Sequence, residues 1–185
     1  GLSNNLIKEL ENNDKIKPEV FFNKETRFDF LVEKKKQKIN VEENNLIKEL
    51  KNIETIKQEV FFDKEPRFDF LLGKKKEKIF VEVKNVTLFR DKKTAEFPDA
   101  ITSRGSKHLL TLIDAIKKGY KTYLLFLVQV QNMEYFKIAK DIDSEYYKNY
   151  LIAKKAGVNF LAYRCNISNK KIYVEKKLKI INDWL

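Results

Sequence analysis

The chain has 185 residues, enough for one ordinary domain plus an appendage too short to fold alone. Its 38 Lys and Arg residues exceed its 27 Asp and Glu residues, and the formal net charge of +11 favours a polyanionic partner such as nucleic acid. A lysine-rich solvated surface explains the charge equally well. One Cys (Cys165) and one His exclude an internal disulfide and a Cys/His zinc cluster. No apolar run is long enough to cross a bilayer, so we expect a cytoplasmic protein with no membrane partner.

The N-terminal part of the chain contains a direct duplication. Residues 4–42 return as residues 44–82, with 28 of 39 positions identical and 11 different. We therefore predict an incomplete duplicate over residues 1–43 and one domain over residues 44–185. The second copy should occupy the sheet, because it leads directly into the rest of the domain. Residues 1–43 would then dock on a sheet edge or on a second molecule, giving a homo-oligomer.

Each copy predicts one helix followed by three strands. In the second copy, Leu46, Ile47, Leu50 and Ile53 have helical spacing. A strand over residues 59–62 follows, and then a hairpin of residues 67–72 and 78–84 around an exposed turn.

The remaining segments alternate between helix and strand. We predict helices over residues 103–118 and 144–156, each stopped by a glycine, and strands over residues 121–130, 158–167 and 171–175, with a short helix at the C-terminus. The strand, helix, strand order implies parallel pairing. The predicted fold class is α/β, a mixed sheet with helices on both faces and an additional duplicated helix and hairpin at the N-terminus.

The hairpin brings acidic and basic side chains together. Strand periodicity places Phe68, Phe70 and Leu72 on one face and Asp69 on the other. On the partner strand it groups Phe80 with Glu82 and Lys84, the latter two about 7 Å apart. Two carboxylates and one amine can therefore converge.

Such a group suits phosphodiester hydrolysis, which requires an activated water and neutralisation of transition-state charge. Asp69 and Glu82 would hold Mg²⁺ or Mn²⁺, and Lys84 would orient water or stabilise negative charge. Glu49, at the edge of the helical stripe, is a further catalytic candidate, although a solvent-facing role is equally consistent with its spacing. The pattern Asp-x12-Glu-x-Lys is weak by itself.

The first copy cannot supply the same set. It retains Asp29 and Glu42, but Glu43 and Asn44 follow where a Val and a Lys are required.

A second candidate region lies at the start of the helix over residues 103–118. Arg104, Lys107 and His108 lie near free backbone N–H groups that can hold a phosphate. Helix capping with ordinary surface charge is the alternative interpretation.

Two longer motifs, VEVKNVTL at residues 81–88 and FPDAITSRGSKHL at residues 97–109, resemble those of the sugar fermentation stimulation protein A family. The resemblance runs from about Asn44 to the C-terminus. It implies a PD-(D/E)XK restriction-endonuclease-like core in a DNA-binding protein linked to regulation of sugar fermentation genes. The matching motif positions are Glu49, Asp69, Glu82 and Lys84, with Asp99 as a further metal ligand and Gln129 as a nucleic-acid contact.

One feature departs from the family pattern. Members normally begin with an OB-fold-like domain, and the duplicated segment stands in its place. Three hypotheses follow: a DNA-binding, Mg²⁺-dependent nuclease, a non-catalytic DNA-binding regulator of sugar metabolism genes that retains the fold, and an assembly protein that uses residues 1–43 as a docking arm.

Overall fold

The computed structural model describes residues 53–63, 66–167 and 172–181. The whole first copy of the repeat, and the helix predicted to carry Glu49, lie outside these residues. The described elements follow one another along the chain as β1 (Thr55–Phe61), β2 (Arg67–Lys74), β3 (Glu77–Val86), β4 (Leu88–Phe89), β5 (Thr94–Phe97), α4 (Ser103–Lys117), β6 (Lys121–Val128), β7 (Tyr135–Ile138), α5 (Ser144–Ala156), β8 (Asn159–Ile167) and β9 (Ile172–Ile180).

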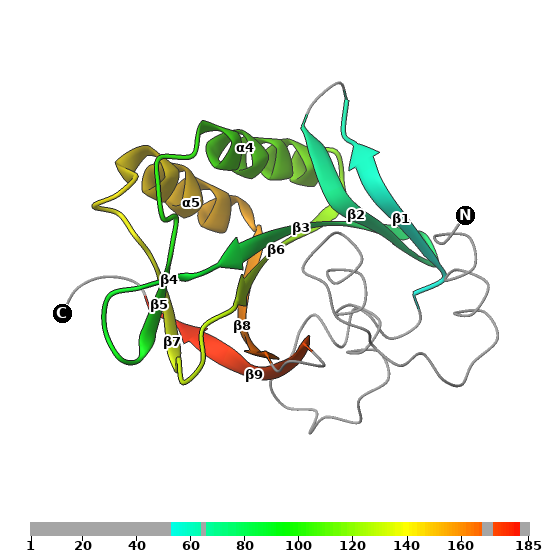
Figure 1. Cartoon of the computed structure of the whole chain (residues 1–185). Helices are drawn as coiled ribbons and strands as arrows, with labels where there is room; N and C mark the ends of the chain where they lie inside the picture. The colour runs from blue at the N-terminus through cyan, green and yellow to red at the C-terminus, as the bar shows by residue number, and fades with distance from the viewer. Residues whose placement is uncertain (1–52, 64–65, 168–171, 182–185) are drawn as a thin grey trace.

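The strands form one mixed sheet in the order β1-β2-β3-β6-β8-β9-β7-β5-β4. The antiparallel β1–β2–β3 unit begins in the second copy of the repeat and continues past its end to Val86, and it joins parallel strands β6 and β8 through β3. Strand β9 then pairs antiparallel with β8 and parallel with β7. Figure 1 shows that the sheet curls strongly from β1 to β9, so the protein is α/β with a curled mixed sheet.

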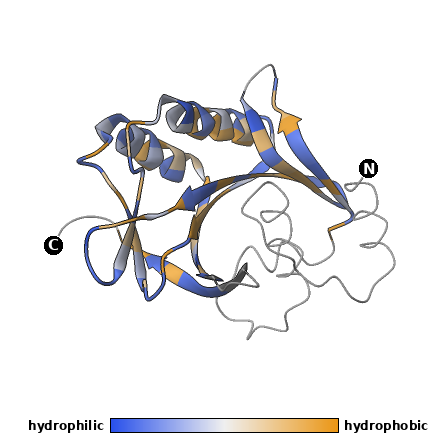
Figure 2. Cartoon of the chain, viewed as in Figure 1, coloured by the Kyte–Doolittle hydropathy of each residue, from blue (hydrophilic) through white to orange (hydrophobic). Residues whose placement is uncertain are grey.

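Helices α4 and α5 lie side by side over one face of the sheet (Figure 1). Their apolar residues share a core with Phe80, Leu124 and Phe126. Buried side chains of the opposite face, including Val81 and Val83, form a second core to which neither helix contributes. Helices were expected on both faces of the sheet. Within the described residues they cover one face only. Figure 2 shows hydrophobic residues along the central strands, whereas hydrophobic and hydrophilic residues alternate along the two helices. Neither described helix is long and apolar enough to cross a membrane.

The two helices begin and end as their sequences predict. Thr102 caps α4 by accepting a hydrogen bond from the Gly105 N–H, and Gly157 ends α5 with a φ of 104°. The Asp143 carboxylate accepts from the N–H of Tyr146 and, across the helix pair, from the N–H of Thr102, each at 2.8 Å. One side chain therefore fixes the N-terminal ends of both helices.

Several strands differ from prediction. Strand β1 begins at Thr55 rather than Glu59, because Thr55 and Ile56 already pair with β2. The predicted C-terminal helix is wrong over residues 176–180, which continue β9: Leu178 is buried between lysines, with the two-residue period of a strand. The short strands β4, β5 and β7 were not predicted, since two to four residues carry too little periodicity.

The prediction that Phe68 and Phe70 share a face is also wrong. Phe68 belongs to the helix-side core and Phe70 to the opposite one. In the neighbouring strand β1, Glu59 lies between the pairs Gln58–Phe70 and Val60–Phe68 and has a positive φ of 52°. The β2–β3 ladder stops at the pair Phe70 and Val81. Asp69 therefore lies where β2 separates from β3.

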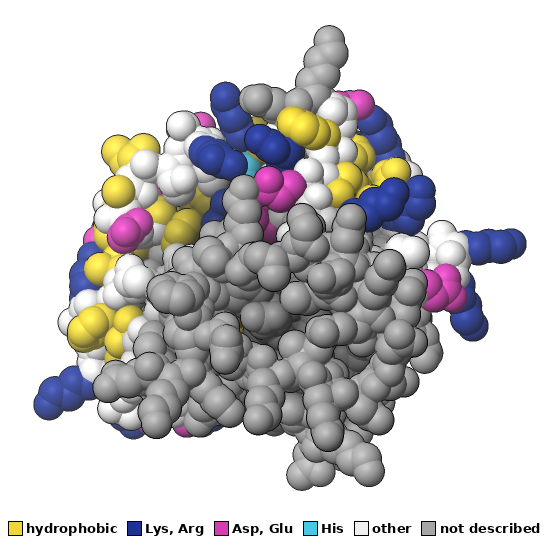
Figure 3. Space-filling model, turned by 45° about the vertical axis from the view of Figure 1, so that its right-hand side comes forward, with side chains coloured by type: hydrophobic (Ala, Val, Ile, Leu, Met, Phe, Trp, Pro, Cys, Tyr) yellow, Lys and Arg dark blue, Asp and Glu magenta, His cyan; other side chains and the backbone are white. Residues whose placement is uncertain are grey.

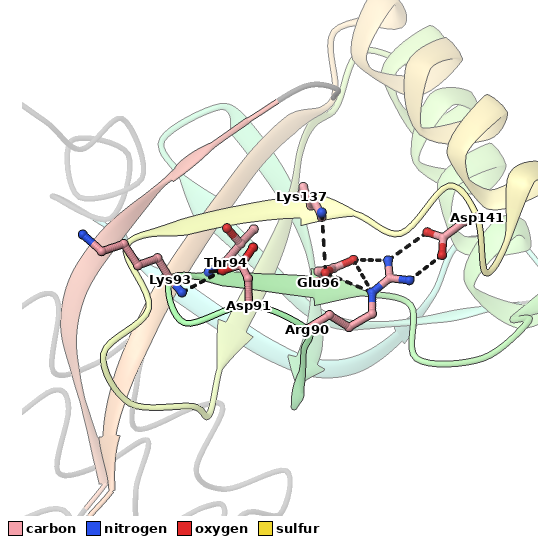
Figure 4. A network of polar contacts seen from close by, with 7 residues as sticks. All are labelled: Arg90, Asp91, Lys93, Thr94, Glu96, Lys137 and Asp141. Atoms are coloured by element: carbon pink, nitrogen blue, oxygen red, sulfur yellow. Dashed lines mark hydrogen bonds and ion pairs between the residues drawn. The ribbon is translucent and has the colours of Figure 1, made fainter. Parts of the chain in front are cut away.

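An ion-pair network joins the far edge of the sheet to the segment before α5 (Figure 4). The Arg90 guanidinium donates to the buried Glu96 of β5 and to Asp141, with 2.8 Å between Arg90 Nη2 and Asp141 Oδ1. Lys137 of β7 lies 3.6 Å from Glu96. The charge of Glu96, which is only 1% exposed, is thereby compensated.

Candidate functional site

Three ionisable side chains meet between β3 and α4. Glu82 and Lys84 project from the same face of the central strand β3, as predicted, and His108 projects toward them from α4. Lys84 Nζ donates to Glu82 Oε1 at 2.7 Å, His108 Nδ1 contacts the same oxygen, and Lys84 Nζ lies 3.2 Å from His108 Nδ1. Glu82 and His108 are each only 2% exposed. We refer to these three residues as the Glu–Lys–His cluster.

The cluster holds Glu82 as a carboxylate. Burial opposes ionisation, but the His108 hydrogen bond and the Lys84 charge outweigh it, and the pKa of Glu82 is lower than its ordinary value. Only Oε1 takes part in the contacts. Glu82 Oε2 is buried and has no hydrogen-bond partner. An ionised oxygen in that state is suited to receive a cation or a water.

Asp69 lies on the neighbouring strand at the point where the β2–β3 ladder ends. Its Oδ2 accepts a hydrogen bond from the Val83 N–H at 2.8 Å, and its side chain is half-buried. The carboxylate thus takes the place of a backbone carbonyl between the strands, beside the residue that follows Glu82.

The fit of a divalent cation can be tested on these residues. Mg²⁺ keeps several waters and is typically bound by one or two carboxylates. Glu82, with its unpartnered buried oxygen, and Asp69 supply that number of carboxylates on adjacent strands. No group of three or more His, Cys, Asp or Glu side chains in the described parts of the chain is arranged to hold a metal. The residues present therefore fit a hydrated Mg²⁺ or Mn²⁺ better than a fully protein-ligated ion.

The other predicted site residues lie at several places. Arg104 and Lys107 are exposed on the first turns of α4, whereas His108 is buried and contacts Glu82 instead of extending the exposed basic group. Asp99 is exposed in the loop between β5 and α4. Gln129 follows β6, its N–H donates to the Val86 carbonyl at 2.8 Å, and its side-chain nitrogen is buried with no partner. Cys165 is buried.

The surface above the cluster is basic. The chain has one histidine, so the cyan side chain visible in Figure 3 is His108. Lys and Arg side chains surround it, and acidic side chains lie beside it (Figure 3). Positively charged side chains therefore lie at the surface beside the cluster.

Two features of the site were missed by sequence reasoning. His108 precedes Leu112 by four residues, so the helical period that predicted the core also places His108 on the buried face. Tyr146 of α5 is fully buried with an unpartnered hydroxyl, and burial followed by the Glu82 charge raises the pKa of Tyr146 well above its ordinary range. No sequence signal connects Tyr146 to Glu82, because they belong to different elements 64 positions apart (146 − 82).

The fold and the cluster define a class of protein: an α/β protein whose curled mixed sheet carries a buried glutamate, held by a lysine and a histidine beneath a helix. The chain belongs to the sugar fermentation stimulation protein family, because residues 39–171 match the family model described as "Sugar fermentation stimulation protein RE domain".

Relatives of known sequence and structure agree with this assignment. The chain is 73% identical over 182 residues to a sugar fermentation stimulation protein homolog of Pelagibacter ubique, covering 98% of this chain and 61% of the relative. It is 38% identical over 100 residues to the Bartonella quintana homolog, covering 54% of this chain and 43% of that protein. The chain thus spans about two fifths to three fifths of the length of these relatives.

A solved structure described as Pyrococcus furiosus SfsA in complex with Ca²⁺ is similar in fold. It is 29% identical, with a TM-score of 0.67, and the match covers 74% of this chain and 59% of that one.

Proposed function

We propose that this chain is a DNA-binding protein with a divalent-metal-dependent phosphodiesterase site of the PD-(D/E)XK type. The observation that carries the proposal is the unpartnered, buried Oε2 of Glu82, beside Lys84 and one residue from the Asp69 contact. Mg²⁺ or Mn²⁺ bound there would supply charge neutralisation and an activated water.

The chain's own residues then have distinct tasks. Glu82 and Asp69 would hold the cation through carboxylate oxygens from adjacent strands. Lys84 is partly exposed, at 15% for its side chain, so its ammonium can face a phosphate while it contacts Glu82. Glu49 and Asp99 remain proposed contributors from outside the cluster.

The metal assignment has support from the solved relative, which was described as a Ca²⁺ complex. Ca²⁺ and Mg²⁺ both bind oxygen ligands, and carboxylates are common to their sites. A Ca²⁺-binding relative of the same family is consistent with a hard-cation site in this chain.

The nucleic-acid assignment draws on charge. Arg104 and Lys107 are exposed on the first turns of α4, on the same helix as His108, and the formal net charge of the chain is +11. These two side chains and Gln129 are the proposed DNA contacts. DNA affinity should fall steeply with salt, since binding releases counterions.

A nicking assay tests the proposal. Supercoiled DNA is incubated with Mg²⁺ or Mn²⁺ and with wild-type protein, Lys84→Ala, or Lys155→Ala, whose exposed lysine lies in the last turn of α5. Wild type and Lys155→Ala should nick equally, and Lys84→Ala should be slower by roughly 100-fold, typical of losing one electrostatic contact to the transition state. Equal nicking by all three proteins, or nicking by none, would remove the enzymatic assignment.

A non-catalytic DNA-binding regulator is the second candidate. It is favoured by the absence of a three-residue ligand group in residues 53–63, 66–167 and 172–181. This candidate predicts salt-dependent DNA binding with no nicking under any metal.

A further inference from the structure

We propose that His108 is a positioning residue for this metal site: its Nδ1–H holds Glu82 Oε1 together with Lys84, so that Oε2 is the atom presented to the cation. The inference rests on the proposed function and deepens it, because it assigns a task to each oxygen of Glu82 and to a side chain that contacts neither DNA nor metal.

The hydrogen-bond chemistry of the cluster determines which atom carries the proton. Lys84 Nζ has donors only, and a glutamate carboxylate has acceptors only. His108 Nδ1 contacts Glu82 Oε1 directly and lies 3.2 Å from Lys84 Nζ. An unprotonated His108 Nδ1 could accept a hydrogen bond from Lys84. Its lone pair would then face the lone pairs of Glu82 Oε1, which is repulsive. A protonated Nδ1 donates to Oε1, so the geometry selects the Nδ1–H form.

Because both donors contact the same oxygen, the two oxygens of the Glu82 carboxylate have different surroundings. Oε1 accepts from Lys84 and from His108, whereas Oε2 is buried and unpartnered. Rotation of the carboxylate would break both contacts. Oε2 is consequently held in a single direction before any cation arrives, and such preorganisation raises metal affinity.

His108 itself is held firmly. It lies within α4 and its ring packs edge-on against Phe68, with 6.2 Å between centroids and 74° between planes. Phe68 is fully buried and lies one residue before Asp69. The same packing therefore links the imidazole to both strands that carry the proposed ligands.

The cluster also has a purely structural interpretation, in which Lys84 and His108 only neutralise a buried charge. The two interpretations differ in what a substitute for His108 must provide. Positioning requires a donor at the place of Nδ1. Neutralisation requires positive charge in the neighbourhood, which Lys84 alone supplies in every His108 variant.

Three variants separate these requirements. The amide nitrogen of Asn can occupy the place of Nδ1, so His108→Asn keeps the donor. His108→Gln carries its amide one bond further, near the place of Nε2, and His108→Ala has no donor. Lys117→Ala, which removes an exposed lysine from the last turn of the same helix, is the control.

The readouts are Mn²⁺ affinity by titration calorimetry and the separate kcat and KM for DNA nicking. We expect His108→Asn to keep the Mn²⁺ Kd within about threefold of wild type, and His108→Gln and His108→Ala to weaken it by roughly 10- to 100-fold, as for other residues that orient metal ligands. KM for DNA should stay unchanged while kcat falls in parallel with metal affinity.

The outcomes distinguish the two proposals. Wild type that binds no Mn²⁺ would overturn the proposed function itself. If wild type binds Mn²⁺ and all three His108 variants bind it as tightly as wild type, the positioning role alone is overturned. The same holds if all three variants lose affinity equally.

A measurement on wild type covers the case in which a variant fails to fold. Because the chain has one histidine, a ¹⁵N NMR spectrum of tag-free protein reports the His108 ring without overlap. A protonated Nδ1 is expected, and an unprotonated Nδ1 would overturn the inference.

Discussion

At the scale of single residues, each of the two glutamates buried in the described parts of the chain has basic partners. Glu82 is held by Lys84 and His108, and Glu96 by Arg90 and Lys137. The two groups differ in one respect. Glu96 accepts hydrogen bonds through both carboxylate oxygens, whereas Glu82 Oε2 has no hydrogen-bond partner. That difference separates a structural ion pair from a candidate site.

The Arg90 network predicts an acid-sensitive contribution to stability. Hydrogen bonding to Arg90 lowers the pKa of Asp141 from 3.8 to about 2. A carboxyl with a depressed folded-state pKa stabilises the fold above its unfolded pKa, and this stabilisation is lost as pH falls from about 4 to about 2. Asp141 is half exposed, so the effect should be modest and reduced by salt.

Urea unfolding at pH 7, 4 and 3 measures this contribution. Asp141→Asn should unfold more easily than wild type at pH 7, and the difference should shrink toward pH 3. Asp114→Asn, which removes an exposed carboxylate paired with Lys117, is the control. A difference that stays constant with pH would contradict the assignment to Asp141.

At the scale of elements, the helix pair determines where His108 lies. Helices α4 and α5 pack closely where Gly105 faces Tyr146: a Cβ on Gly105 would lie 3.0 Å from the Tyr146 ring and 2.8 Å from the Thr102 side chain. Asp143 ties the two N-terminal ends together. The orientation of α4, and thus of His108 toward Glu82, depends on these contacts.

We predict that Asp143→Ala destabilises the fold by about 2–3 kcal/mol, because it removes the α5 cap and leaves the Thr102 N–H unsatisfied. The free energy of unfolding from denaturant titration measures this loss. Glu145→Ala removes an exposed acidic residue from the same first turn and should change it by a few tenths of a kcal/mol. Equal effects of the two substitutions would contradict the capping role of Asp143.

At the scale of the whole molecule, the chain carries two copies of a segment, and the second copy forms part of the sheet. Every described strand and helix comes from residues 55–180, and β3, which begins in the second copy and ends beyond it at Val86, pairs with β6 through eight residue pairs. The first copy lacks the lysine that corresponds to Lys84. The proposed site therefore needs the second copy.

Deletion of residues 1–43 tests the role of the first copy. We predict that residues 44–185 keep the thermal unfolding temperature and the Mn²⁺ affinity of the full chain, as measured by circular dichroism and calorimetry. Sedimentation equilibrium at several concentrations then reports on the proposed homo-oligomer. A dimer that persists after the deletion would exclude residues 1–43 as the docking segment, and loss of folding would contradict the domain boundary.

Much of the architecture followed from the sequence by itself. Periodicity located α4, α5, β6 and β8 to within two residues, and the two-residue period of β3 grouped Phe80, Glu82 and Lys84 correctly. Such patterns are local, since each depends on residues within one helix or strand. The sequence motifs likewise indicated the family. The short strands escaped prediction because two to four residues carry too little periodicity, and the end of β9 pairs with β7, which is distant in the chain.

Only the tertiary structure decided how the site is assembled. The contact of His108 with Glu82 and the burial of Tyr146 near that carboxylate each join elements far apart in the sequence. Period and propensity describe which face a side chain takes on its own element, but not which side chain of another element it meets. The free Oε2 of Glu82 is a consequence of that packing, and local pattern contains no information about it.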